Sequence, residues 1–112
     1  MAKPAARAYS SYSRDAIVLL GQMIRLGRIN RKLTIAELAE RADVSRGLIQ
    51  RIERGDPGCS IGAVFEVAAI VGVRLFDADQ RTLSGSIVSN RQMLTLLPKS
   101  ARPAPRAVKD DF

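Results

Sequence analysis

The side chains that this sequence offers for chemistry are mainly cationic and amide groups, because the groups that catalysis and metal binding usually need are scarce. The 112 residues include no His and one Cys, Cys59. This composition excludes a Ser-His-Asp or Cys-His centre, a zinc site that uses His, and a zinc site made of Cys alone. We therefore expect no enzymatic activity, no cofactor and no metal. A single Cys cannot form an intrachain disulfide, which favours a reducing compartment.

Polar side chains suited to reading DNA recur at helical spacing in the middle of the chain. Arg46 and Gln50 stand one helical turn apart, with Gly47 beside them. Arg pairs with the O6 and N7 atoms of guanine, and Gln pairs with the N6 and N7 atoms of adenine. We predict that Arg46 and Gln50 contact base edges and that Gly47 permits close approach to DNA. Arg51 and Arg54 are predicted to contact phosphates or to form ion pairs at the surface.

The first of two short helices that position these side chains begins with a capping box. The Thr34 hydroxyl is placed to accept the amide of Glu37, and the Glu37 carboxylate is placed to reach back. This signal predicts a helix over residues 35–41. Asp43 follows it and suits a tight turn, because Asp tolerates the left-handed backbone region.

The second short helix is predicted over residues 46–54, with Ser45 as its cap and Gly55 as its end. Two helices joined by such a turn form a helix-turn-helix, whose second helix enters the major groove. Glu53 is predicted to pair with an Arg rather than to face DNA. Apolar residues expected to hold the two helices together and to the core are Leu38, Ala39, Val44, Ile49 and Ile52.

A longer helix is predicted over residues 14–31, with Ser13 as its cap. Gly21 and Gly27 weaken this helix on propensity, so we expect them to mark close helix crossings. Its inward face is predicted to carry Ile17, Leu20 and Ile24.

Positive charge gathers before the capping box. Residues 1–32 hold seven cations and one acid, whereas residues 33–72 hold four cations and six acids. The cations expected to meet the DNA backbone are Arg25, Arg28, Arg31 and Lys32; the alternative is that they complement a helix dipole. Residues 1–12 are predicted to be a flexible basic arm rather than a cleaved targeting peptide. We expect no membrane segment, because the longest uncharged apolar run near the N-terminus, 16–24, is shorter than the roughly 20 residues required.

The segments after the second short helix, residues 60–97, give less uniform signals for secondary structure. Ser60 is predicted to cap a helix over residues 61–71 that Gly72 ends. Up to residue 76, alternation of polar and apolar residues is too short to predict a strand, and residues 73–76 are the one short segment that would fit one. Residues 82–97 fit either one helix or two short strands, at 86–88 and 93–97. Their apolar residues on one helical face would be Leu83, Ile87, Leu94 and Leu97.

The central segment LTIAELAERADVSRGLIQRIERG resembles the Xre/Cro-repressor helix-turn-helix family over about residues 20–73. The positions that match the family pattern are Thr34, Leu38, Ala39, Val44, Ser45, Ile49, Ile52, Glu53 and Gly55. Thr34 and Ser45 therefore join the candidate DNA-binding residues in addition to their capping roles. Two positions depart from the pattern: Ile35 replaces a Gln that usually contacts a phosphate, and Asp43 replaces the turn Gly.

The segment RIERGDPGCSIGAVFEVAAIVGV, with Leu-Pro-Lys at 97–99 and Lys-Asp-Asp-Phe at 109–112, is similar to HipB-type antitoxins. That resemblance implies a dimer that represses its own operon and neutralises a HipA-like Ser/Thr kinase toxin. The alternative is a plain Xre-family regulator without a toxin partner.

We therefore expect an all-α, lambda-repressor-like bundle of four to five helices that binds double-stranded operator DNA as a homodimer in the cytoplasm, at the nucleoid. The predicted parts are the arm (1–12), the DNA-binding domain (13–76), a dimerisation element (77–97) and a disordered tail (98–112). Repression would be steric, on a palindrome whose half-sites lie about one helical turn, 10 base pairs, apart.

Overall fold

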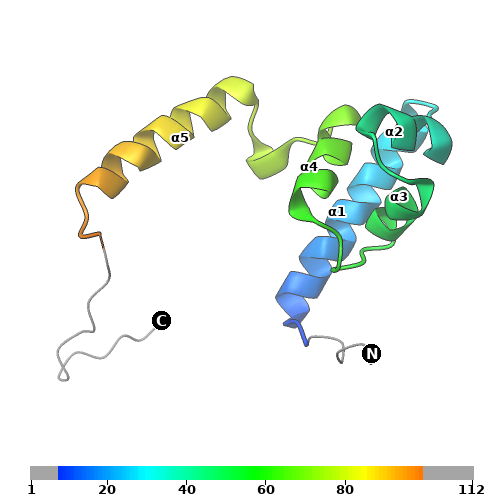
Figure 1. Ribbon diagram of the computed structural model, residues 1–112, viewed down its shortest axis with the longest axis horizontal. Helices are drawn as coiled ribbons and strands as arrows, with labels where there is room; N and C mark the ends of the chain where they lie inside the picture. The colour runs from blue at the N-terminus through cyan, green and yellow to red at the C-terminus, as the bar shows by residue number, and fades with distance from the viewer. Residues whose placement is uncertain (1–7, 100–112) are drawn as a thin grey trace. The chain divides into compact units, whose positions relative to one another are not determined.

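The computed structural model describes residues 8–99 of the chain (Figure 1), so most of the predicted arm and of the predicted tail, including the motif at 109–112, lies outside the described residues. Within this range the chain forms five α-helices and no strand, which confirms the predicted all-α, lambda-repressor-like fold. Two compact units, Met1–Asp77 and Ala78–Phe112, divide the chain. The elements are α1 (Ser11–Asn30), α2 (Ile35–Ala42), α3 (Arg46–Glu53), α4 (Ile61–Ile70), the 3₁₀ turn η1 (Leu75–Asp77) and α5 (Gln80–Thr95).

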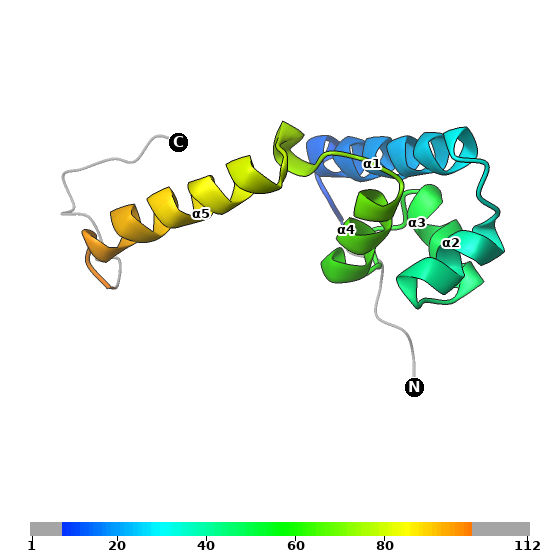
Figure 2. The same cartoon turned by 90° about the horizontal axis from the view of Figure 1, so that it is seen from above.

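The first unit is a four-helix bundle built around α1. Figure 2 shows α1 along one side of the group that α2, α3 and α4 form. Helices α1 and α2 each contact both α3 and α4. All four helices contribute to one apolar core, which consists of Ile24, Leu38, Ala39, Ile49, Ile52, Val67, Ala68 and Val71. The residues predicted to hold α2 and α3 together are therefore buried or packed against this core, and burial of apolar area is the main force that orients α3.

Helix α1 begins earlier than the sequence predicted. Ser10, not Ser13, is the N-cap, because its hydroxyl accepts the amide of Ser13 at 3.2 Å. Ser11 and Tyr12 therefore belong to the helix rather than to the arm. Serines at 10, 11 and 13 offer equivalent capping hydroxyls, and local sequence does not rank them.

Two further local predictions need correction. Ser60 occupies the N-cap of α4, but its side chain makes no capping hydrogen bond. The short strand that residues 73–76 would fit is absent. The chain turns there through η1, with Phe76 and Asp77 at φ values of 57° and 49°. An extended strand cannot contain consecutive residues in the left-handed region.

The second unit contains α5, so the helical alternative for residues 82–97 is the one that the structure adopts. Asp79 caps this helix by accepting the Thr82 amide at 2.8 Å. None of the α5 side chains is buried.

The capping box of α2 forms as predicted and makes the domain sensitive to acid. The Glu37 carboxylate accepts the Thr34 amide at 2.8 Å, and the Thr34 hydroxyl accepts the Glu37 amide at 3.0 Å. These bonds lower the pKa of Glu37 below its ordinary value of 4.5. A lowered folded-state pKa stabilises the protein above the unfolded-state value, and the benefit disappears as pH falls through the folded-state value.

We therefore expect the urea midpoint of the chain to fall as pH is lowered from about 6 to about 3. Glu37→Gln keeps an acceptor for the Thr34 amide but cannot titrate, so it should lose less of its midpoint over this interval. Asp56 titrates in both proteins and cancels in the comparison. If Glu37→Gln and the parent chain lose the same amount of their urea midpoint, Glu37 is not a cause of the acid sensitivity.

Candidate nucleic-acid interface

Helix α3 buries one face in the core and exposes the opposite face to solvent. Ile49 and Ile52 lie in the core, whereas Arg46 and Gln50 are exposed. Ser45 caps the helix by accepting the Leu48 amide at 3.1 Å. The two predicted base-reading side chains therefore share the solvent side of one short helix whose start is fixed by its cap.

Gly47 lies on the same exposed side. A Cβ built at this position meets only the Ser45 hydroxyl, at 3.9 Å. The fold itself therefore has no need of Gly here, which distinguishes Gly47 from the Gly residues at helix crossings.

The turn before α3 has the geometry that the sequence predicted. Asp43 adopts φ 56° and ψ 48°, in the left-handed region, and its amide bonds the Ala39 and Glu40 carbonyls that end α2. Thr34, at the other end of α2, is exposed. Ile35 packs against the core cluster, so the position at which family members usually carry a phosphate-binding Gln holds a structural apolar residue.

Arg28, predicted to contact phosphate, is instead an internal structural residue. Its Nε donates to Glu53 Oε2 at 2.7 Å, its Nη2 to Glu53 Oε1 at 3.1 Å, and its Nη1 to the Leu33 carbonyl at 3.0 Å. The side chains of Arg28 and Glu53 are only 12% and 7% exposed. The bond to Glu53 raises the pKa of Arg28, so the guanidinium stays charged. This pairing confirms the role predicted for Glu53 and commits the donors of Arg28 within the protein.

Arg31, also predicted to meet the DNA backbone, is exposed and its side chain makes a hydrogen bond within the protein, so its contact with DNA stays a prediction. Its Nη1 donates to the Val71 carbonyl at the end of α4, and its guanidinium lies over Gly72. Cations near a helix C-terminus often satisfy its last carbonyls in this way. Arg31 therefore ties α1 to α4.

Arg51, predicted either to contact a phosphate or to form an ion pair at the surface, forms an ion pair with Asp56. Its Nε donates to Asp56 Oδ2 at 2.9 Å. Asp56 also accepts the Gly58 amide at 2.8 Å, and both bonds lower the pKa of its carboxyl group.

A groove of about 300 Å³ adjoins α3. Its lining residues are Arg25, Arg28, Ile35, Gln50, Glu53 and Arg54. Because Arg28 and Glu53 neutralise each other, the net charge at the groove comes from Arg25 and Arg54. In the sequence, Arg25 is only one of several cations near the end of α1 that are expected to meet the DNA backbone. Arg25 lies about one helical turn before Arg28. This spacing alone does not indicate that Arg25 is exposed and that Arg28 is mostly buried.

Comparison with known proteins agrees with this geometry. A family model described as a helix-turn-helix domain matches residues 19–83. The chain belongs to this helix-turn-helix family. The domain is of the Xre/Cro-like kind, in agreement with the resemblance that the sequence suggested. No curated protein and no solved structure matches the chain.

The helix-turn-helix domain identifies a DNA-binding regulator. The total charge of the domain is a poor guide to this function, because several of its acids have partners within the protein. Glu37 is engaged in the capping box, Glu53 with Arg28, and Asp56 with Arg51. These three acids are held by partners within the protein, whereas Arg46 and Arg54 remain exposed. Near α3, Glu53 and Asp56 are each paired with an Arg, and Arg46 and Arg54 are exposed cations.

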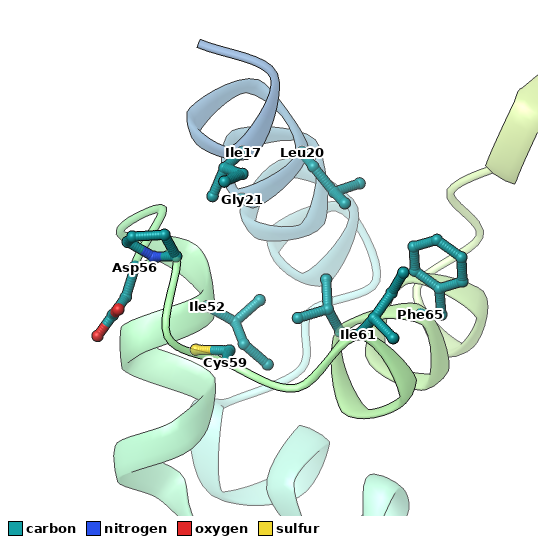
Figure 3. A pocket seen from close by; sticks show the side chains of 10 residues that line it. Ile17, Leu20, Gly21, Ile52, Asp56, Cys59, Ile61 and Phe65 are labelled. Carbon is teal, nitrogen blue, oxygen red and sulfur yellow. The ribbon is translucent and has the colours of Figure 1, made fainter. Parts of the chain in front are cut away.

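The helix-turn-helix domain also contains an apolar cavity of about 280 Å³ between α1, α4 and the loop that follows α3 (Figure 3). Cys59 lies in its wall, half-buried, and burial raises the pKa of the thiol. A raised pKa leaves less reactive thiolate at neutral pH. The cavity is lined mainly by Ile17, Leu20, Ile52, Ile61, Val64 and Phe65. These features fit Cys59 as a small residue of the loop before α4 that packs in the cavity wall.

None of the helices in residues 8–99 is long and apolar enough to cross a membrane. The same residues contain no cluster of acidic, His or Cys side chains that would hold a metal ion.

Proposed function

We propose that the chain is a sequence-specific transcriptional repressor that reads the DNA major groove with α3. The observation that carries this proposal is the exposed pair Arg46 and Gln50 on a helix whose opposite face is locked into the core of a helix-turn-helix domain. Each side chain offers a bidentate pattern for a purine edge. Gly47 beside them lets the α3 backbone approach the bases.

Phosphate contacts would fix the register of the domain on DNA. The exposed guanidinium groups of Arg25 and Arg54 at the groove support such a role, and Arg25 takes the place first given to Arg28. Thr34 and Ser45 also remain candidates. Each hydroxyl accepts an amide hydrogen bond as a cap, which leaves its O–H free to donate to a phosphate oxygen.

We further propose that the repressor acts as a homodimer in the cytoplasm, at the nucleoid, and blocks transcription by occupying a palindromic operator. A single domain of this size makes few contacts, and two half-sites on one DNA would raise its affinity through effective concentration.

Arg46→Ala tests the assignment of the reading helix. Sites are first selected from a random duplex library with the full chain, and affinities are then measured by fluorescence anisotropy. We expect a loss of roughly 1–3 kcal/mol on a selected site and relaxed preference at one base pair.

The matched control for Arg46→Ala is Arg81→Ala, which removes the same charge from α5. It should change affinity equally for selected and scrambled DNA, because a general charge effect does not read sequence. If the two variants behave alike on both DNAs, α3 is not the reading helix.

A HipB-type antitoxin is the more specific form of this proposal. It is supported by the sequence similarity that runs from the end of α3 through α4, by Leu97-Pro98-Lys99, and by the motif at 109–112. A kinase encoded beside this chain should co-purify with it, and deletion of residues 101–112 should abolish co-purification while leaving DNA binding intact. Retention of the kinase by the shortened chain would favour a plain Xre-family regulator.

A further inference from the structure

Helix α5 belongs to the second unit and has no buried core of its own. It spans 16 residues and buries none of them. Isolated helices of this length are marginal in water, and this one contains several poor helix formers. These are Ser84, Gly85, Ser86, Ser89 and Asn90. Most apolar side chains of α5 are exposed and are available to a partner.

The apolar residues of α5 follow a heptad pattern. Within α5, Leu83, Ile87, position 90 and Leu94 follow one another at intervals of four, three and four residues, which is the spacing of a coiled-coil seam, and Leu97 continues this spacing just beyond the end of the helix. Ile87, Leu94 and Leu97 are 53%, 66% and 58% exposed. The central seam position, 90, is Asn. We refer to these five residues as the α5 seam.

We propose that the α5 seam pairs in parallel with the α5 seam of a second copy of the chain. In parallel register each residue meets its own counterpart, so Asn90 meets Asn90 of the second copy. An amide carries both donors and an acceptor, and two Asn side chains therefore satisfy each other across a two-fold axis. In an antiparallel heptad pair, Asn90 would instead face Ile87 and leave a buried amide unpaired, which costs about 1–3 kcal/mol.

The charges of α5 also fit a second copy. Its two cations, Arg81 and Arg91, lie outside the seam, and no seam residue is charged. Two copies therefore bring no like charges into the contact. A different protein would need its own apolar stripe with a polar group at the layer of Asn90, whereas a second copy supplies both by symmetry.

This pairing names the interface of the homodimer proposed above and rests on that proposal for its role on DNA. Three apolar layers and one Asn layer within α5, with Leu97 just beyond them, make a small interface, below the roughly 1,200 Å² of stable complexes. We expect dimerisation at micromolar concentrations, strengthened when two half-sites hold two copies on one DNA.

Two adjacent residues of matched exposure provide the test. Ile87 is in the seam and is 53% exposed, and Val88 is outside it and is 51% exposed. In the full chain, Ile87→Asp should raise the dimer dissociation constant at least about a hundredfold, because two charges are buried at one layer. Val88→Asp should leave it within about threefold. Sedimentation velocity over a concentration series measures both.

Equal behaviour of the two variants, or a parent chain that is monomeric at about 100 μM, would overturn the proposal. Binding to DNA with a single half-site separates this result from the function proposed for α3. Ile87→Asp should bind one half-site like the parent chain and lose cooperativity only on two. If the parent chain binds no half-site but Ile87→Asp still dissociates the dimer, the DNA proposal fails and the α5 pairing stands.

Cross-linking tests the parallel orientation in a Cys59→Ser background. Leu83→Cys alone should form an intermolecular disulfide, since position 83 faces its own counterpart. In an antiparallel pair, position 83 faces position 94, so cross-linking would require a mixture of Leu83→Cys and Leu94→Cys chains. Cross-linking of the mixture alone would contradict the parallel register.

Discussion

Arg28→Ala will destabilise the helix-turn-helix domain by about 3 kcal/mol, a large part of the stability of a small domain. The substitution leaves the Glu53 carboxylate, which is only 7% exposed, without its bidentate partner. It also removes the donor to the Leu33 carbonyl in the connection between α1 and α2. Arg28 joins α1 to α3 through Glu53 and to the α1–α2 connection through Leu33. Its loss therefore weakens the packing of α1 against α3.

Chemical denaturation measures this effect, and a double-mutant cycle with Glu53→Ala isolates the pair. Arg51→Ala is the matched control, because the Arg51–Asp56 pair has a similar Nε–Oδ2 distance of 2.9 Å but side chains that are 44% and 33% exposed. Solvent screening makes such an exposed pair contribute much less to stability than the mostly buried Arg28–Glu53 pair. A loss on Arg28→Ala no larger than that on Arg51→Ala would show that the Arg28–Glu53 pair contributes little.

The same variant distinguishes the internal role of Arg28 from the phosphate contact that its sequence position suggested. Under conditions in which Arg28→Ala is folded, the slope of log K against log salt should equal that of the parent chain. A slope reduced by about one unit would mean that Arg28 contacts a phosphate.

The signals that predicted the DNA-binding unit correctly are local. Thr34 and Glu37 are three residues apart, Asp43 lies in the turn, and Gly55 ends α3 at a φ of 80°. Each acts through backbone groups within one helical turn, so residue type and spacing are sufficient to predict it. The position and exposed face of α3 followed from these signals and from its apolar periodicity.

The contacts that the sequence did not predict join residues far apart in the chain. Arg28 meets Glu53 25 residues later, and Arg31 meets the Val71 carbonyl 40 residues later. A series of cations at the end of a helix looks the same in sequence whether each faces DNA or the protein interior. The sequence predicted an Arg partner for Glu53, but only helix packing determines that it is Arg28 rather than Arg25.

Gly21→Ala is expected to destabilise the domain by at least about 2 kcal/mol, although Ala is the better helix former. A Cβ at position 21 would lie 2.5 Å from the Ile52 carbonyl oxygen, 3.1 Å from the Glu53 carbonyl oxygen and 3.2 Å from the Gly55 amide nitrogen. All three atoms belong to the backbone at the end of α3, so no side-chain rotation relieves the contact. Helix α1 would have to move away from α3 and open the core around Ile52.

Gly62→Ala provides the control with the same chemical change in a helix of the same domain. A Cβ at position 62 has no atom within 4 Å, so only helix propensity changes and the variant should gain up to about 1 kcal/mol. Opposite shifts in melting temperature are therefore expected for the two substitutions. Because Gly21 contacts the end of α3 rather than its exposed face, any DNA affinity lost by folded Gly21→Ala should affect selected and scrambled sequences together. Stabilisation by Gly21→Ala would mean that α1 and α3 do not cross as closely as this backbone contact requires.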